Sequence, residues 1–165
     1  MSQLPPIRIG LGHDTHRIGK GGPLTLGGIT IEGDLHLIGH SDADVLLHAI
    51  TDAILGAVCL GDIGTLFPNT ADQNENRCSR EMLQLAYSKV VEAGWKITNL
   101  DCVIFATQPK ISPYRDAIIH CITKTLKMED GNVFVKGKTG ENVGPIGRGE
   151  AIMAECVALL HKASD

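Results

Sequence analysis

Two short polar clusters near the start of the chain combine residue types that bind metal ions. The first is Asp14-x-His16, which follows the apolar run 7–11 that we expect to be a strand. Because residues two apart in a strand point to the same side, this carboxylate and this imidazole would converge on one point. An isolated Asp-x-His is more often a polar turn after a strand, so the spacing alone is weak evidence for a metal site.

The second cluster is His48, with Asp44 and Asp52 four residues to either side on the predicted helix 43–58. Residues four apart share a helix face, and the rest of this helix is apolar nearly all round, which is typical of a buried helix. A lone histidine on a buried helix is usually a hydrogen-bonded core residue. Here, burying three polar groups without partners would cost about 1–3 kcal/mol each, so something polar should meet this face.

Asp14, His16 and His48 together form a set of one carboxylate and two imidazoles. Such a set suits a zinc site in which three protein ligands leave the fourth tetrahedral position open for a substrate oxygen. We further hypothesise that Asp52 or Asp44 orients His48 from outside the ligand set.

Two glycine-rich loops could complete a site for an anionic substrate. In segment 61–64, glycines on either side of Asp62 let the backbone approach a ligand and leave the carboxylate able to accept hydrogen bonds from hydroxyl groups. The same segment also fits a helix end and turn. In segment 136–149, small residues, two lysines and Thr139 could surround phosphates with donors. Its spacing is not that of a P-loop, and its composition fits a solvated loop equally well.

Strands interleaved with three helices must position these residues. We expect strands 7–11 and 24–31 to form a hairpin across the glycine-rich stretch 19–22, and Ser41 to cap helix 43–58 in a capping box with Asp44. The other expected elements are helices 79–93 and 113–127 and strands 97–107, 132–138 and 151–160. The last of these could be strand or helix by periodicity, and the glycines before it favour a strand.

A mixed β-sheet with helices packed on one face, an α/β or α+β sandwich, is the natural solution for this order of elements. We expect residues 1–165 to form a single domain.

Composition excludes several classes of function. The chain has 165 residues, 43% hydrophobic and 4% aromatic, with a net charge of -4 and no basic stripe, so no nucleic acid is expected as a partner. None of its five cysteines lies in a Cys-x-x-Cys pair, which fits reduced thiols in a cytosolic protein. No apolar run is long enough for a membrane span, and the N-terminus shows no targeting peptide. We therefore expect a cytoplasmic bacterial protein, with a plastid protein that has lost its transit peptide as the alternative.

Taken in order, these segments resemble the 2-C-methyl-D-erythritol 2,4-cyclodiphosphate synthase family. The Asp-x-His pair followed by the segment from His40 to Asp52 is highly specific, and the resemblance runs from about Ile7 to Lys162. The matching stretches are Arg8–His16, His40–Asp52, Leu60–Gly64 with Phe67-Pro68, Gln108–Lys110, Asn132–Lys136, Thr139–Glu141 and Gly147–Glu150.

The resemblance implies a homotrimer with an active site at each boundary between neighbouring subunits. The implied substrate is a cytidine diphosphate compound, 4-diphosphocytidyl-2-C-methyl-D-erythritol 2-phosphate. Its 2-phosphate attacks the β-phosphorus, which closes an eight-membered ring and expels CMP. Because this step brings like charges together, the site must neutralise charge and fix geometry. The implied metals are Zn2+, or another divalent transition metal, on Asp14, His16 and His48, and Mg2+ or Mn2+ on Glu141.

The resemblance also implies roles for the remaining site residues. His40 and Thr139 match positions that stabilise the transition state, and His40 and Ser41 match positions that contact the attacking phosphate. The other implied substrate-binding residues are Phe67; Asp62, Ile63 and Gly64 around the erythritol; Ala106, Pro109, Lys110, Ile111, Ser112 and Lys138 in a cytidine pocket supplied across the subunit boundary; and Arg148 at the polar end of a channel on the trimer axis.

The chain departs from the family pattern at two positions. Lys138 stands where many relatives have threonine, so a hydroxyl becomes an ammonium group that either contacts phosphate or faces solvent. Pro145 stands where many relatives have the phenylalanine that lines the axial channel, so an isoprenoid ligand in that channel does not follow here.

Two other classes of function use the same residues. A zinc phosphohydrolase would use the three ligands to activate water, and would yield linear phosphate products. A trimeric binding module would hold a structural ion, but structural zinc usually has four protein ligands, often cysteines. No cysteine of this chain is placed with Asp14, His16 or His48 in the sequence.

Overall fold

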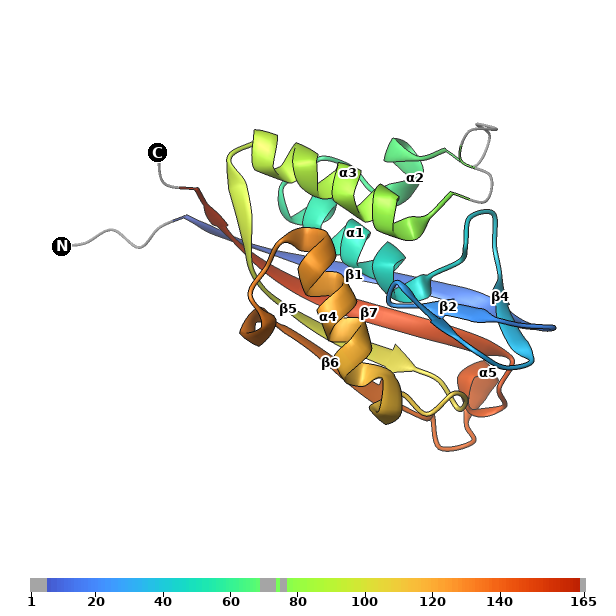
Figure 1. Cartoon of the computed structure of the whole chain (residues 1–165). Coiled ribbons are helices and arrows are strands. Elements are labelled where there is room, and N and C mark those ends of the chain that lie inside the picture. The colour runs from blue at the N-terminus through green and yellow to red at the C-terminus, as the bar shows by residue number, and fades with distance from the viewer. Residues whose placement is uncertain (1–5, 69–73, 75–76, 164–165) are drawn as a thin grey trace.

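The computed structural model describes residues 6–68, 74 and 77–163, and its largest element is a five-stranded mixed sheet (Figure 1). The strands lie in the order β4-β1-β7-β5-β6. Strands β5 and β6 pair in parallel, whereas the other neighbours pair antiparallel. The bounds of the strands are Ile7–Lys20 (β1), Leu35–Ile38 (β4), Trp95–Phe105 (β5), Val133–Lys138 (β6) and Ala151–Lys162 (β7), and a separate hairpin joins Leu24–Leu26 (β2) to Ile29–Ile31 (β3).

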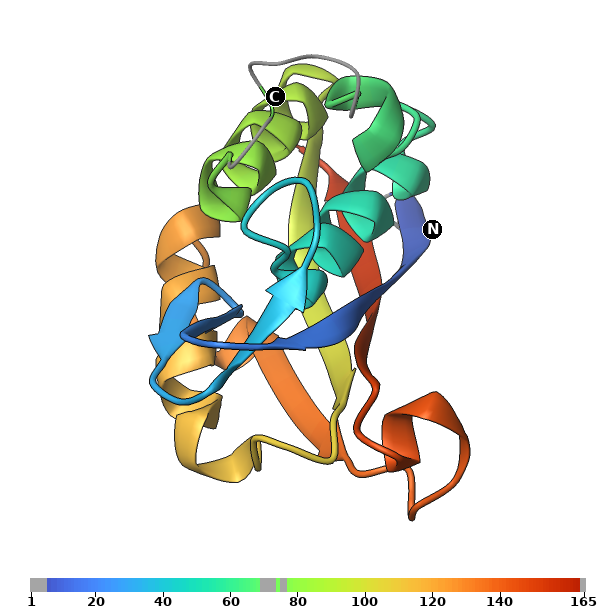
Figure 2. The same cartoon turned by 90° about the vertical axis from the view of Figure 1, so that its right-hand side faces the viewer.

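Three helices lie on one face of this sheet (Figures 1 and 2). Helix α1 (Val45–Ala57) packs against β1 and β7 and also against α3 (Ser79–Glu92), and α4 (Arg115–Leu126) packs against β6. Shorter pieces are α2 (Ile63–Leu66), α5 (Gly144–Gly147) and the 3-10 turns η2 (Ser112–Tyr114) and η3 (Asp130–Asn132). None of the helices in the described residues is long and apolar enough to cross a membrane.

Helix α1 lies unusually close to the backbone of β1. Every residue of the helix except Asp52 and Gly56 is buried. Gly10 and Gly12 of β1 face it, and a Cβ atom added at either glycine would lie 1.8 Å from a backbone oxygen of α1. These two glycines are therefore needed for the helix to pack directly on the strand. The close packing sets the distance between side chains of β1 and side chains of α1.

Helices α1, α3 and α4 all lie on the same face, and none of these three covers the opposite face of the sheet (Figure 1). On β1 the residues that alternate with the two glycines are Ile7, Ile9 and Leu11, and they are 61%, 69% and 69% exposed. Leu11 pairs with Val157 of β7, and Phe134 of β6 lies further along the same row. Asp101 of β5 lies between Val157 and Phe134 in this row, so the face is mixed. Its exposed apolar side chains are nevertheless typical of a protein–protein contact.

Most of the predicted elements are confirmed. The three helices begin and end within two residues of the predicted positions, and residues Ala151–Lys162 form a strand, as the preceding glycines indicated. The predicted mixed α/β fold, with its helices on one face of a mixed sheet, is also confirmed.

The predicted hairpin between strands 7–11 and 24–31 is wrong. Strand β1 runs on to Lys20 and pairs with β4 and β7, whereas residues 24–31 form the small hairpin β2–β3 on their own. The turn of that hairpin is Gly27-Gly28, with φ angles of +62° and +79°, a conformation that favours glycine. Strand β4 has only four residues, which is too short for a clear alternation of apolar and polar residues, and it was not predicted.

The predicted capping box is also wrong in its residues. Asp44, and not Ser41, is the N-cap of α1, because its side chain accepts hydrogen bonds from the backbone N–H groups of Leu46 and Leu47. The same carboxylate accepts hydrogen bonds from the backbone N–H groups of Gly27 and Gly28. Asp44 therefore ties the β2–β3 turn to the start of α1.

Candidate metal centre

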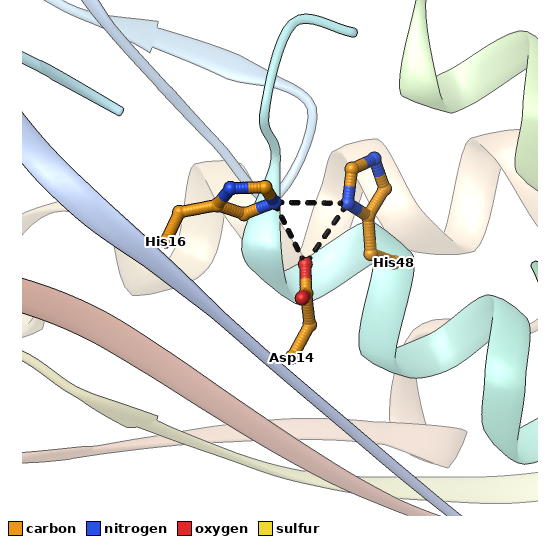
Figure 3. A group of neighbouring side chains, drawn as sticks. All are labelled: Asp14, His16 and His48. Carbon is orange, nitrogen blue, oxygen red and sulfur yellow. Dashed lines mark hydrogen bonds and ion pairs between the residues drawn. The ribbon is translucent and has the colours of Figure 1, made fainter. Parts of the chain in front are cut away.

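Three polar side chains converge beside the start of α1 (Figure 3). Asp14 Oδ2 lies 3.0 Å from His16 Nε2 and 2.9 Å from His48 Nδ1. The two histidine nitrogens lie 3.4 Å apart. Within the described residues these three form a group that could hold a metal ion.

The local folds on both sides explain this convergence. Asp14 and His16 lie two apart on β1, on the same face as Gly10 and Gly12, so both point toward α1. His48 lies on the first turn of α1, which the two glycines bring close to the strand. The three side chains are only 26%, 18% and 10% exposed, so the protein shields them from much of the solvent.

The spacing of the three donor atoms fits a tetrahedral ion. Zinc binds imidazole nitrogen and carboxylate oxygen at about 2.0–2.2 Å, so two of its ligands in a tetrahedron lie about 3.3 Å apart. The observed separations of 2.9, 3.0 and 3.4 Å are close to that value. Imidazole and carboxylate donors also suit other divalent transition metals, and three ligands leave one position open.

The protonation of the group follows from its geometry. Burial raises the pKa of Asp14, but the hydrogen bonds and positive charge of His16 and His48 outweigh burial and hold the pKa well below its ordinary value. The hydrogen bond to Asp14 raises the pKa of His16 above its ordinary value of 6.5, against the opposing effect of burial. In the absence of a metal, the carboxylate therefore stays ionised and attracts a proton to the neighbouring imidazole.

Each histidine has a partner for the ring nitrogen that faces away from the group. His16 Nδ1 donates to the carbonyl oxygen of Ile38 on β4 at 3.0 Å. His48 Nε2 lies 2.8 Å from Ser79 Oγ and 3.2 Å from Ser41 Oγ. Such contacts fix the orientation and tautomer of a metal-binding imidazole.

The hypothesis that Asp52 or Asp44 orients His48 is wrong. The Asp44 carboxylate accepts hydrogen bonds from four backbone N–H groups, two in the β2–β3 turn and two at the start of α1. The Asp52 carboxylate accepts from the backbone N–H of Ile63 at 2.7 Å. Asp44 lies just before the helix as its N-cap, Asp52 lies on the helix with His48, and each carboxylate accepts from nearby backbone N–H groups. Asp52 instead anchors the start of α2 to α1.

A pocket of about 190 Å³ opens beside the three donors. It is lined by Asp14, His16, His40, Ser41, His48, Ile63, Gly64, Phe67, Asn74 and Met82. The structure thus brings His40, Ser41, Ile63, Gly64 and Phe67 together with the candidate ligands, as the resemblance implied. Asp62 does not line the pocket; its side chain caps α2 by accepting from the backbone N–H of Thr65 at 2.7 Å, and hydrogen bonds with Thr65 lower its pKa.

The remaining predicted residues gather at a different place. A pocket of about 130 Å³ at the ends of β5 and β6 is lined by Ala106, Lys110, Ile111, Ser112, Arg115, Gly137, Lys138 and Thr139. Pro109 lies in an adjoining pocket with Lys110, between this loop and the β3–β4 segment. Glu141 is exposed and accepts a hydrogen bond from Thr139 Oγ1 at 3.1 Å. None of these residues lines the pocket at the metal group.

Arg148 belongs to neither pocket among the described residues. Its guanidinium forms an exposed ion pair with Glu150, with Nε and Oε1 2.7 Å apart. Sequence reasoning missed Ser79, Asn74, Met82 and Arg115, which line the two pockets or contact the metal group. No spacing rule links them to the motifs, because they come from other elements.

Comparisons with known proteins agree on one family. The model of the YgbB family matches residues 7–161. A Rhodopirellula baltica protein named 2-C-methyl-D-erythritol 2,4-cyclodiphosphate synthase is 49% identical over 98% of this chain and 99% of its own length. A Chromobacterium violaceum protein of the same name is 50% identical over 95% of this chain and 99% of its own length.

Solved structures show the same relationship. The bifunctional IspDF of Campylobacter jejuni superposes with a TM-score of 0.93 at 40% identity, and the match covers 96% of this chain but 43% of that longer protein. IspF of Plasmodium falciparum in complex with CDP superposes with a TM-score of 0.85 at 37% identity, over 98% of this chain and 100% of that one. On sequence and on fold alike, this chain belongs to the YgbB family.

Proposed function

We propose that this protein is a metal-dependent lyase that converts 4-diphosphocytidyl-2-C-methyl-D-erythritol 2-phosphate into 2-C-methyl-D-erythritol 2,4-cyclodiphosphate and CMP, a step of isoprenoid precursor synthesis. The observation that carries the proposal is the tetrahedral spacing of Asp14, His16 and His48. It occurs in a chain whose full-length relatives at about half identity bear the name of this synthase. Residues 1–165 would act as one catalytic domain.

The donor set supports zinc at this group. A zinc ion held by the three side chains supplies a Lewis acid that offsets the negative charge of phosphate oxygens. For the second cation, Mg2+ or Mn2+, the proposed ligand is Glu141, since an exposed carboxylate is the donor type that these ions prefer. Both assignments follow the resemblance.

The protein's own residues would position the reacting phosphates. His40 and Ser41 line the pocket beside the metal group, where their side chains can donate hydrogen bonds to the attacking phosphate. His40 and Thr139 would stabilise charge on the transferring phosphorus, and Phe67 would help exclude water that competes with ring closure. The proposed substrate-binding residues are Ser41, Asp62, Ile63, Gly64 and Phe67 on the metal side, Ala106, Pro109, Lys110, Ile111, Ser112 and Lys138 on the nucleotide side, and Arg148.

Two separate pockets support an active site shared between subunits. A substrate that carries a cytidine at one end and an erythritol phosphate at the other needs both groups of residues, and no one pocket of the described chain contains both. The exposed side chains of Ile7, Ile9 and Leu11, on the sheet face away from the helices, offer apolar surface on which copies could associate. A homotrimer that places the metal pocket of one subunit against the nucleotide pocket of the next satisfies both observations. Its cytoplasmic location stays a prediction.

The reaction product tests the proposal. Incubation of the purified protein with the cytidyl substrate, zinc and magnesium, followed by phosphorus NMR, should show the two coupled resonances of a cyclic diphosphate together with CMP. Linear phosphate products without ring closure would contradict the proposal and would indicate a zinc phosphohydrolase instead.

A further inference from the structure

We propose that Ser79, supported by Asp42, is a positioning residue for the metal centre: its hydroxyl holds the imidazole of His48 in the orientation and tautomer that present Nδ1 to the ion. The inference deepens the proposed function and rests on its metal centre. It concerns residues that come from α3 and from the loop before α1, outside the ligand set itself.

The contacts form a continuous chain from a carboxylate to a metal ligand. Ser79 Oγ lies 2.8 Å from His48 Nε2. The same hydroxyl makes a short hydrogen bond to Asp42 Oδ1. At the other side of the ring, His48 Nδ1 faces Asp14 Oδ2 at 2.9 Å, within the candidate metal group. The three groups Asp42, Ser79 and His48 therefore lie in series behind the ion site.

The direction of the hydrogen bonds follows from what each atom can do. Asp42 accepts only, because an ionised carboxylate has no proton to donate, so the Ser79 hydroxyl donates to it. The lone pairs of that hydroxyl oxygen then face His48 Nε2, which must carry the proton and donate it. With the proton on Nε2, the lone pair of Nδ1 points at the metal group, as metal binding requires.

Burial strengthens this arrangement. Ser79 and His48 are both buried, and Ser79 is only 1% exposed, so water cannot easily replace either partner. A buried hydrogen bond in surroundings of low dielectric constant is stronger than one in solvent. Turning the imidazole over would take the Nε2 proton away from Ser79 Oγ, and losing this hydrogen bond between buried groups would cost about 1–3 kcal/mol.

Ser41 is the weaker of the two hydroxyl partners of His48. Its Oγ lies 3.2 Å from Nε2, compared with 2.8 Å for Ser79 Oγ. It also accepts a hydrogen bond from the backbone N–H of Ala43 and lines the open pocket, where the substrate is expected. The single proton of Nε2 therefore goes mainly to Ser79, which leaves Ser41 able to serve the substrate.

Asp42 has a second role that must be separated from the first. The backbone N–H of Ser79 donates to Asp42 Oδ2 at 2.9 Å, at the start of α3, where the N-cap residue Cys78 makes no side-chain cap bond. Asp42 thus caps α3 from a distant segment. Ser79→Ala keeps this backbone contact and removes only the hydroxyl, so it is the cleaner variant.

Metal affinity, measured without substrate, tests the inference directly. The protein is stripped with a chelator, and its affinity for zinc alone is measured by competition with a chromophoric chelator. Ser79→Ala should weaken zinc binding about 10–100-fold, the usual effect of losing an outer partner of a metal-binding histidine. Ser79→Thr, which keeps the hydroxyl, should restore most of the affinity. Ser88→Ala removes an exposed hydroxyl from the same helix and should change nothing.

Two further readouts separate positioning from a merely structural effect. Bound Co2+ in Ser79→Ala should show visible absorption bands that differ in position and intensity from those of the parent protein, because one ligand is reoriented. At saturating zinc, turnover of the same variant should fall while KM changes little, since the substrate contacts remain.

The outcomes distinguish this inference from the proposed function. Zinc affinity of a folded Ser79→Ala within twofold of the parent protein would overturn the inference, whatever the activity. Failure of the parent protein to form the cyclic product would instead overturn the proposed function, even if zinc affinity behaves as expected. If Ser79→Ala does not fold, Asp42→Asn takes its place: weakened zinc binding supports the inference and unchanged binding overturns it.

Discussion

The pocket beside the metal group (the metal pocket) and the pocket at the ends of β5 and β6 that we propose for the cytidine (the nucleotide pocket) are built from different kinds of structure. The metal pocket is formed by the middle of the long strand β1 and by helix α1, in which nearly every residue is buried. Its donor atoms lie close to one another. The nucleotide pocket is formed by strand ends and a 3-10 turn, and Lys110, Lys138 and Ser112 are exposed. Residues of one chain bring the donors of the first pocket together. For the second pocket, the proposed function calls for an opposing surface from a neighbouring subunit.

Loss of the metal ligand His48 should have the largest effect. His48→Ala removes one of three donors and leaves Asp14 and His16 unable to hold an ion tightly, so turnover should fall about 10³-fold or more. Zinc content measured by atomic emission should fall in parallel. His120→Ala, an exposed histidine on α4, is the matched control and should keep both zinc and activity. Retained activity in His48→Ala would refute the ligand set.

Mixing two inactive variants tests whether the two pockets belong to different subunits. His48→Ala damages the metal pocket and Lys110→Ala damages the nucleotide pocket. In co-expressed trimers with random assortment, about one boundary in four would combine two intact pockets, so activity should recover to about one quarter of the parent value. The pair His48→Ala and His16→Ala damages the same pocket and should show no recovery. Absence of recovery in the first pair would place both pockets within one subunit.

A substitution at Gly12 should disturb the metal pocket and leave the nucleotide pocket intact. A Cβ atom there would lie 1.8 Å from the backbone oxygen of Ala49, so Gly12→Ala must push α1 away from β1. The stability of the protein should fall by about 1–3 kcal/mol, and zinc affinity should fall because His48 moves from Asp14. Gly56→Ala on α1 meets no atom within 4 Å and should be neutral or stabilising in chemical denaturation.

The stabilisation that zinc provides should depend on pH. In the metal-free protein the raised pKa of His16 means that its stabilising charge is fully present below pH 6.5 and is lost as the pH rises through the raised value. Asp14 stays ionised above about pH 4 and does not change in this range. Zinc must displace the His16 proton, so the rise in Tm on adding zinc should be a few degrees larger at about pH 8 than at about pH 6. An equal rise at both values would contradict this protonation scheme.

The sequence predicted the parts of the fold that depend on local periodicity. Asp14 and His16 could be placed together because side chains two apart on a strand share a face, and His48 because a polar residue in an apolar helix needs a partner. The three helices and the strand Ala151–Lys162 follow from the same kind of local pattern. The three helices lie on one face of the sheet, as the order of the elements predicted.

Features that depend on which elements meet in space could not be predicted. Strand β1 pairs with β4 and β7 and not with residues 24–31, because strand pairing depends on the packing of the whole sheet. Ser79 reaches His48 across 31 positions through the packing of α3 on α1. Asp44 and Asp52 were assigned to His48 from spacing, whereas backbone N–H groups of neighbouring segments satisfied both carboxylates.

The central claim is that the metal pocket of one subunit and the nucleotide pocket of its neighbour bind one substrate molecule together. A crystal structure of the protein with zinc and CDP, with anomalous data collected at the zinc edge, tests it most directly. We expect one strong peak about 2.0–2.2 Å from Asp14 Oδ2, His16 Nε2 and His48 Nδ1. The cytidine should lie beside Lys110 of the adjacent subunit, with its phosphates directed at that peak. A zinc peak elsewhere, or a nucleotide whose cytidine and phosphates contact one subunit alone, would contradict it.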